Sequence, residues 1–423
     1  MVYQKGTAST LSAQLLTTDD AAGGFTLSVK ADGQTVIVAL PNGQTRPLTL
    51  PDSLFAGSDT MALFVGVAPH AAIQVPVLAL SEAPTGQMGE MQGPFLKDLA
   101  DRRGITIGTL GIESPWESLA TDQYYPTLMR EFNLIVTFNS MKEVLPFDRA
   151  TYSFARLDNI VGFGQQNGLR LRENPLIWGE DLPDWLLNGT FSRDELIGIL
   201  RDYVTTLVGR YKGKISEWEV VNEAFTKNGG YEDNVWFRGI GPEYIELAFR
   251  AARAADPTAT LLYNDYQNES AGAKADAIYR MAADFKARGV PLDAIGLEMH
   301  LHDGYPWYPT PTKDGVLANM RRFGALGLAV NVTEIDVNTY YMTGTPDEKR
   351  IRQARIYRDM LSACLESSVC KSFTLWGFTD AHSWLFGPAY VRPGQAEAPM
   401  ILDEHYNPKP AYYSLRDTLL AGG

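Results

Sequence analysis

The sequence lacks features that several functional classes require. No apolar run reaches the roughly 18 residues that a membrane helix needs, so a membrane partner is not expected. Lys and Arg number 37 against 50 Asp and Glu, a net charge of −13. This balance argues against nucleic acid as the main partner, because phosphate contacts need clustered basic residues. No charged-then-apolar signal peptide stands at the start of the chain.

Cysteine is also scarce, with only Cys364 and Cys370 in the chain. They are either buried free thiols, as in a cytosolic protein, or one local disulfide, as in a secreted protein. The 423 residues suit a barrel of roughly 250 to 350 residues plus a small module. Aromatic residues make up 11% of the chain, a content that fits either core packing or sugar stacking.

The first 85 residues read as a β-rich module. Apolar residues alternate over 25–29 and 36–40, and Asp32-Gly33 lies between these runs as a hairpin signal. Later runs include 71–81, which resembles the last strand of a jelly-roll sandwich. We expect an incomplete sandwich over 1–85, a longer natural chain, and a linker over 86–98.

From residue 99 to 423, short apolar strands alternate with helical stretches, the pattern of βα units. Eight strands are predicted, at 106–110, 133–138, 169–177, 217–222, 260–264, 294–299, 329–334 and 372–377. Eight units favour a closed (β/α)8 TIM barrel over an open sheet. No GxGxxG follows the first strand, so a dinucleotide site is unsupported.

Two glutamates stand at strand ends, where the active site of such a barrel lies. Glu223 follows the fourth strand and Glu334 ends the seventh, so the two face each other across the mouth. Glycoside hydrolysis needs two carboxyls that flank the bond. Barrels carry many glutamates at strand ends, so it is the opposed pair that favours this chemistry.

The motifs around both glutamates resemble those of glycoside hydrolase family ten, the xylanase family of clan A. The similar segments are 218–223 (WEVVNE), 332–336 (VTEID), 263–266 (YNDY), 376–380 (WGFTD), 383–384 (SW) and 407–412 (NPKPAY). They occur in the right order over roughly 100–420. The resemblance implies an endo-acting β-1,4-xylanase with a retaining mechanism, a polysaccharide substrate, and no cofactor or metal.

The resemblance also implies roles for single residues. Glu334 corresponds to the nucleophile, Glu223 to the acid/base, and Asn222 to a ligand of the sugar 2-hydroxyl. His300 corresponds to the histidine that orients the nucleophile. His300 and His302 form an H-x-H pair, but no third metal ligand is evident.

Further substrate-binding positions follow from the same motifs. Trp178, Trp376 and Trp384 correspond to aromatic walls around the reacting sugar, whose apolar face suits an aromatic ring. Tyr266 corresponds to a residue on the leaving-group side. Each of these aromatics also fits ordinary core packing.

The chain departs from the family pattern where the glycone sugar binds. At 137–143 (TFNSMKE), Asn139 and Lys142 match the family, but Phe138 replaces a sugar-binding glutamate. At 172–179 (RENPLIWG), Asn174 replaces a sugar-binding histidine. Glu298 replaces a glutamine and brings a potential charge beside the nucleophile. These changes predict weak or atypical activity on plain xylan, because a sugar hydroxyl that loses its partner costs about 1 to 3 kcal/mol.

The family often carries a disulfide where Cys364 and Cys370 stand, so the resemblance points to a local bridge and a secreted protein. We further expect a monomer. Two alternatives remain open: the same mechanism on a different or decorated β-glycan, and a carbohydrate-binding protein without catalysis.

Overall fold

The computed structural model describes residues 93–111, 123–305, 309–386 and 397–421, together with five strands before them. The chain forms two compact units, Met1–Gly93 and Pro94–Gly423. Among the residues that the structure describes, no helix is both long and apolar enough to cross a membrane.

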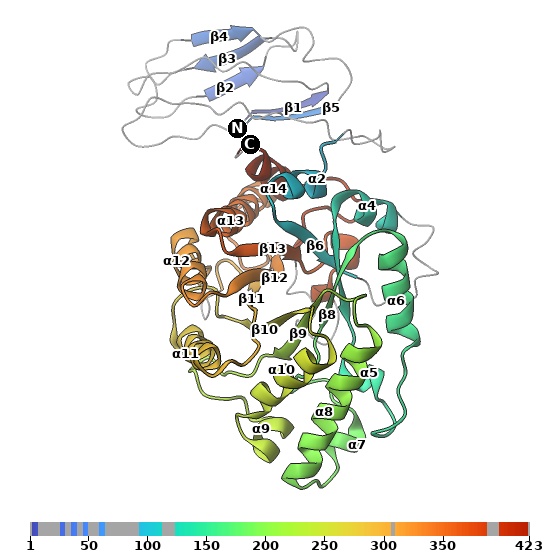
Figure 1. Ribbon diagram of the computed structural model, residues 1–423. Coiled ribbons are helices and arrows are strands. Elements are labelled where there is room, and N and C mark those ends of the chain that lie inside the picture. Colours follow the sequence, from blue (N-terminus) through green and yellow to red (C-terminus); the bar gives the residue numbers. More distant parts are fainter. Residues whose placement is uncertain are drawn as a thin grey trace. The chain divides into compact units, whose positions relative to one another are not determined.

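The first unit contains two antiparallel sheets (Figure 1). β1 (Val2–Gly6) pairs with β5 (Asp59–Leu63). A second sheet has the order β2–β3–β4, and its strands are Thr26–Val29, Thr35–Ala39 and Thr45–Thr49. The hairpin predicted from Asp32-Gly33 agrees with the β2–β3 pairing, whereas the strand predicted at 71–81 lies outside the described residues.

The second unit is a closed barrel of eight parallel strands, as predicted. The strands follow one another around the barrel in chain order, and β13 closes it against β6. They are β6 (Thr106–Leu110), β7 (Leu134–Phe138), β8 (Arg170–Asn174), β9 (Glu217–Asn222), β10 (Thr260–Tyr266), β11 (Ala294–Leu301), β12 (Ala329–Val337) and β13 (Cys370–Leu375).

Helices surround this barrel (Figure 1). The α-helices are α2 (Leu96–Arg102), α4 (Tyr124–Glu131), α5 (Met141–Val144), α6 (Ala155–Gln166), α7 (Asp184–Leu187), α8 (Arg193–Arg210), α9 (Val235–Ile240), α10 (Tyr244–Ala255), α11 (Ala273–Arg288), α12 (Lys313–Gly324), α13 (Pro346–Ser367) and α14 (Pro410–Leu420). Two 3-10 turns, η2 (Asp380–His382) and η3 (Trp384–Phe386), follow β13.

Local sequence explains why the long helices begin where they do. Ser192 caps α8 by accepting the Glu195 N–H, and the Glu195 side chain reaches back to the Ser192 N–H. Thr345 and Glu348 form the same reciprocal cap on α13, followed by a proline at the first helical position. The buried face of α8 recurs every three or four residues: Leu196, Ile199, Leu200, Tyr203, Val204, Leu207 and Val208.

Several predicted boundaries differ from the structure, and three of these differences have a local physical reason. β8 ends at Asn174, because Pro175 has no N–H to continue the ladder. β12 continues past Glu334 to Val337, and all residues after its first are buried. α2 starts at Leu96, inside the range predicted as a linker, since its apolar face is buried.

The barrel interior contains a fully buried arginine that spans it. Arg172 on β8 donates hydrogen bonds to Glu217 (2.9 Å), Ser372 (2.6 Å) and Thr374 (3.3 Å). Ser372 and Thr374 belong to β13, which is not a neighbour of β8. The guanidinium therefore satisfies its donors with groups from separate strands beneath the mouth of the barrel.

Candidate active site

Glu223 follows β9 directly and has a positive φ of 50°, a conformation that is uncommon for a residue with a side chain. Its N–H donates to the Asn264 carbonyl (3.0 Å), and Trp178 Nε1 donates to its carboxyl (3.0 Å). Burial raises the pKa of Glu223 to about 7, and the charges of Asp265 and Glu334 add to this effect. A carboxyl with this pKa can hold a proton near neutral pH.

Glu334 on β12 lies in a different environment. Its Oε1 accepts hydrogen bonds from Asn264 Nδ2 (3.2 Å) and Asn174 Nδ2 (3.3 Å), and its Oε2 lies 2.9 Å from His300 Nε2. Its side chain is 5% exposed. Three donors around one carboxylate fix its orientation.

His300 on β11 connects Glu334 to a second carboxylate. Its Nδ1 lies 2.8 Å from Asp336 Oδ2, which also accepts from Trp384 Nε1 at 2.8 Å. Burial alone would lower the pKa of His300, but Asp336 and Glu334 outweigh burial and raise this pKa to about 10. We infer that His300 carries both protons, one facing each carboxylate.

Asn264 on β10 lies at the centre of the site. Its Nδ2 shares two hydrogens among three acceptors, Asn222 Oδ1 (3.0 Å), Glu298 Oε1 (2.8 Å) and Glu334 Oε1 (3.2 Å). Its Oδ1 accepts from Thr333 Oγ1 at 2.6 Å. The neighbouring strand has Gly296 beside it, where any side chain would collide with Asn264 Oδ1. The orientation of Asn222, a predicted sugar ligand, therefore depends on Asn264.

Glu298 differs from its expected state. Burial and the nearby charges of Glu334 and Glu223 raise its pKa well above the usual range. The shift favours the protonated, neutral form of this side chain over the charged form that its sequence position suggested.

Glu298, His300 and Glu334 also bring one ligand atom each within 4.8 Å of one another. This is a geometry that a metal ion could use, and both ring nitrogens of His300 face carboxylates, those of Glu334 and Asp336. His302, the second histidine of the H-x-H pair, lies outside this group and contacts Asn338 (3.2 Å).

Asn174 turns its amide toward carboxyls within the site. Its Nδ2 donates to Glu219 and, at 3.3 Å, to Glu334. Burial raises the pKa of Glu219 to about 8, with Arg172 opposing this shift. The Asn174 side chain, 1% exposed, is therefore held by protein groups.

The predicted aromatic residues lie around the two carboxyls. Trp384 has its ring centroid 4.8 Å from that of His300, and Trp376 lies 6.3 Å from the same ring. Phe138 packs edge-on between Trp178 and Trp376, at 6.4 Å from each. The side of the site formed by β7 is thus apolar where the family pattern has a glutamate.

The remaining predicted residues lie less directly at the carboxyls. Lys142 is exposed and pairs with Asp181 at 3.8 Å. Asn139 is 1% exposed, with its N–H bonded to the Asn174 carbonyl (3.1 Å). Cys364 and Cys370 form a disulfide between the end of α13 and the start of β13.

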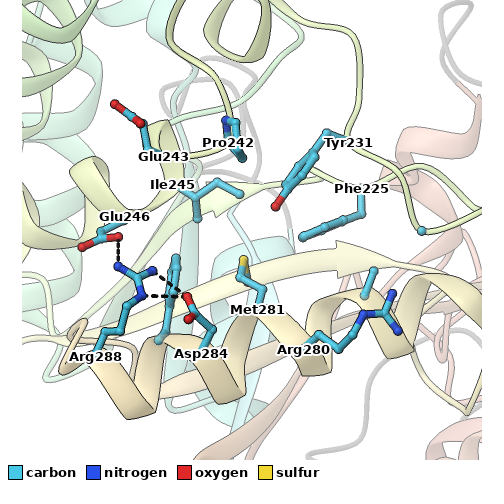
Figure 2. Close-up of a pocket in the computed structure, with 13 residues that line it drawn as sticks. Phe225, Tyr231, Pro242, Glu243, Ile245, Glu246, Arg280, Met281, Asp284 and Arg288 are labelled. Carbon is cyan, nitrogen blue, oxygen red and sulfur yellow. Dashed lines mark hydrogen bonds and ion pairs between the residues drawn. The ribbon is translucent and has the colours of Figure 1, made fainter.

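A separate hollow of about 670 Å³ is lined by the loop after β9, by α10 and by α11 (Figure 2). Phe225 and Tyr231 form an aromatic side of it, with ring centroids 4.9 Å apart. Arg288 joins Glu246 of α10 (2.5 Å) to Asp284 of α11 (2.6 Å) at its edge. These charges fasten two helices together, and no predicted site residue lines this hollow.

Sequence reasoning missed four residues that organise the site: Asn264, Asp265, Asp336 and Glu219. Each of them stands within a motif segment that was recognised, and the available signal was a polar side chain inside an otherwise apolar strand. Their roles depend on contacts between strands, which the spacing within one strand does not reveal.

Residues 95–418 match the family described as Glycosyl hydrolase family 10. The chain is 35% identical over 325 residues to endo-1,4-beta-xylanase B of Thermotoga neapolitana, which covers 77% of this chain and 91% of that protein. Its fold is similar to native xylanase 10B from Thermotoga maritima, with a TM-score of 0.72, 34% identity and coverage of 77% and 98%. It is equally similar to xylanase 10B from Thermotoga petrophila RKU-1 in complex with xylobiose, with a TM-score of 0.72, 36% identity and coverage of 78% and 99%.

Proposed function

Because the chain belongs to glycosyl hydrolase family 10 and is a xylan-degrading glycoside hydrolase, we propose that it cleaves β-1,4-linked xylan with retention of configuration. Glu334 is the nucleophile and Glu223 is the acid/base. The observation that carries this assignment is the contrast between their surroundings. Three donors face the carboxylate of Glu334, whereas burial and nearby negative charge raise the pKa of Glu223 to about 7.

In the first step, a Glu334 oxygen forms a bond to the anomeric carbon while the bond to the leaving sugar oxygen breaks. The proton of Glu223 goes to that leaving oxygen. Trp178 Nε1, which donates to Glu223 (3.0 Å), aims the carboxyl and becomes a stronger partner as negative charge develops on it. The product of this step is a covalent glycosyl-enzyme.

In the second step, Glu223 is a carboxylate and takes a proton from water. The water oxygen bonds to the anomeric carbon, and the bond to Glu334 breaks. His300, protonated and hydrogen-bonded to Glu334, stabilises the carboxylate as it leaves. Asn222 is oriented by Asn264 toward the proposed position of the sugar 2-hydroxyl.

Xylan as substrate is supported by the relatives, which include named endo-1,4-beta-xylanases and a xylanase in complex with xylobiose. The finer preference remains a proposal. Phe138 presents a ring to the site, and the amide of Asn174 is already donated to Glu219 and Glu334. We therefore keep the expectation of reduced turnover on plain xylan, and of a preference for a decorated or different β-glycan.

Two further expectations stay predictions. Secretion is supported by the Cys364–Cys370 disulfide, because such bonds persist in oxidising compartments. A monomeric state is the second of these predictions. The alternative of carbohydrate binding without catalysis has little support, because both carboxyls stand in surroundings that suit their roles.

The test is hydrolysis of plain xylan, glucuronoxylan, arabinoxylan and mixed-linkage β-glucan, with products identified by mass spectrometry. Proton NMR during the first minutes reports the anomer that forms first. We expect the β-anomer, and loss of all activity in Glu334→Ala. An α-anomer would contradict the retaining mechanism, and full activity of Glu334→Ala would contradict the assignment of the nucleophile.

A further inference from the structure

A buried ion pair lies close to the acid/base. Asp265 is on β10 and Lys274 is in the first turn of α11, and their charged atoms are 2.6 Å apart. The two side chains are 0% and 2% exposed. A pair buried this deeply adds little net stability, because desolvation offsets its attraction. Net stability therefore does not explain why this ion pair is present beside the acid/base.

A chain of hydrogen bonds runs from this pair to the acid/base loop. The Tyr263 hydroxyl donates to Asp265 (2.6 Å) and accepts the Ala224 N–H (3.0 Å). Ala224 follows Glu223, whose φ of 50° must be held by its surroundings. Because Tyr263 has one hydroxyl hydrogen, an ionised Asp265 fixes its direction and leaves an oxygen lone pair for Ala224.

The ammonium group of Lys274 also contacts an aromatic residue of the site. Lys274 Nζ lies 3.4 Å from the centre of the Tyr266 ring. The Tyr266 N–H donates to Asp265 at 3.0 Å, so both members of the pair contact this residue. One buried pair thus contacts the half-buried ring of Tyr266 and, through Tyr263, the peptide that follows Glu223.

We propose that Asp265 and Lys274 are a positioning pair that orients Glu223 and sets the upper pH limit of its proton donation. The proposal rests on the proposed role of Glu223 as acid/base. Asp265 acts on Glu223 in two ways, through the peptide held by Tyr263 and through its negative charge. Lys274 keeps Asp265 ionised within a site where burial disfavours charge.

The charges around Asp265 and Glu223 determine in which direction each pKa is shifted. Burial raises the pKa of Asp265 to about 6, with Lys274 opposing that shift, so Asp265 is ionised at neutral pH. Its charge in turn raises the pKa of Glu223. The titratable groups that face Glu223 or Asp265 come from several elements: Glu180 after β8, Tyr244 on α10, Tyr263 and Tyr266 on β10, Lys274 on α11, Glu298 on β11 and Glu334 on β12.

The decisive variant is Asp265→Asn, which keeps the shape of the side chain and removes its charge. The measurement is the pH dependence of kcat/KM for aryl β-xylobiosides with a poor and a good leaving group. Without the charge of Asp265, Glu223 loses its proton more readily. We expect the alkaline limb to move to lower pH by about one unit. Since a good leaving group needs little protonation, that substrate should lose much less activity.

The matched control is Asp380→Asn, which removes an aspartate from the Lys409 pair (2.8 Å; 9% and 6% exposed) after β13. Loss of a buried ion pair should lower the thermal stability of both variants, which thermal unfolding measures. In the control, the alkaline limb of the kcat/KM profile should stay at its wild-type pH. An unshifted limb in Asp265→Asn, with equal losses on both substrates, would overturn the proposal.

Two further variants keep the test decisive if Asp265→Asn fails to fold. Tyr263→Phe removes the link to Ala224, and we expect kcat on the poor leaving group to fall about tenfold with KM unchanged. Lys274→Met should also lower kcat on that substrate, and Lys274→Arg should restore part of it. Unchanged kcat in both Tyr263→Phe and Lys274→Met would refute the proposal.

Glu223→Ala separates this inference from the function on which it rests. If the activity of Glu223→Ala is independent of the leaving group, the role of Glu223 as acid/base is wrong. If it depends strongly on the leaving group while Asp265→Asn behaves as wild type, only the positioning role is wrong.

Discussion

The ends of β9 and β12 present the same side chain in two opposite environments. Glu223 accepts one hydrogen bond, from Trp178, and faces the negative charges of Asp265 and Glu334. Glu334 accepts from Asn174 and Asn264 and contacts a protonated His300. Three donors thus surround the carboxyl of Glu334, whereas one donor and a raised pKa distinguish that of Glu223.

This contrast shows how two glutamates can divide acid and nucleophile chemistry at one pH. A carboxyl with few donors and anionic neighbours keeps its proton, whereas one held by donors stays a carboxylate. The division is set by residues on other strands, since Asn264, His300 and Asp265 come from β10 and β11. The predictions below change one side of the contrast at a time.

The largest effect should come from removing the carboxyl with three donors. Glu334→Ala deletes the proposed nucleophile, and we expect kcat to fall on the order of 10⁵-fold on every substrate. The check is steady-state hydrolysis of an activated aryl xylobioside. Added azide should restore turnover and give an α-configured glycosyl azide, because the anion fills the vacated space; a β-configured azide would contradict the assignment.

Removing the other carboxyl should give a loss that depends on the leaving group. We expect Glu223→Ala to reduce kcat/KM by about 10²- to 10⁴-fold for poor leaving groups and far less for good ones. Wild-type activity should fall as the pH rises through about 7, because Glu223 must hold a proton to act as an acid. The variant should lose this alkaline limb for the good leaving group, and its persistence would assign the limb to another residue.

A smaller loss should follow from weakening the donors without touching either carboxyl. Asn264→Ala removes a hydrogen bond to Glu334 and the support of Asn222. We expect kcat to fall about 10- to 100-fold, since a hydrogen bond to a charged group contributes about 1.5 to 3 kcal/mol. Kinetics with a 2-deoxy glycone should show a smaller drop, because that sugar lacks the hydroxyl that Asn222 is proposed to bind.

The smallest effect should come from Glu298→Gln. Since burial and nearby charges favour the protonated form of Glu298, the amide closely matches the shape and charge of the side chain that it replaces. We expect kcat/KM at neutral pH to change by less than about threefold. A large change that grows as the pH rises would show that Glu298 is ionised and that the negative charge beside Glu334 is greater than inferred.

The parts of this protein that follow from local pattern were predictable. Alternation of apolar strands with helices gave all eight barrel strands, because buried parallel strands and amphipathic helices have distinct periodicities. Glu223 and Glu334 could be chosen because strand ends meet at one mouth. The strand was predicted to end at Glu334, and its extension to Val337 was missed, since polar Asp336 is buried there only through its contacts with His300 and Trp384.

The features of the site that could not be predicted from the sequence depend on contacts among several strands. Asn264 bonds to groups on β9, β11 and β12, and no spacing within β10 signals this. The protonation state of Glu298 could not be inferred either, because it depends on burial and on the charges of Glu334 and Glu223. Charge states are collective properties of the folded site.

The division of roles is tested most directly by trapping the intermediate. A 2-fluoro xylobioside with a dinitrophenyl leaving group forms the glycosyl-enzyme readily but slows its hydrolysis, and peptide mass spectrometry then locates the sugar. The account predicts one label, on Glu334, in wild type and in Glu223→Ala. A label on Glu223, on Glu298 or on any other residue would contradict it.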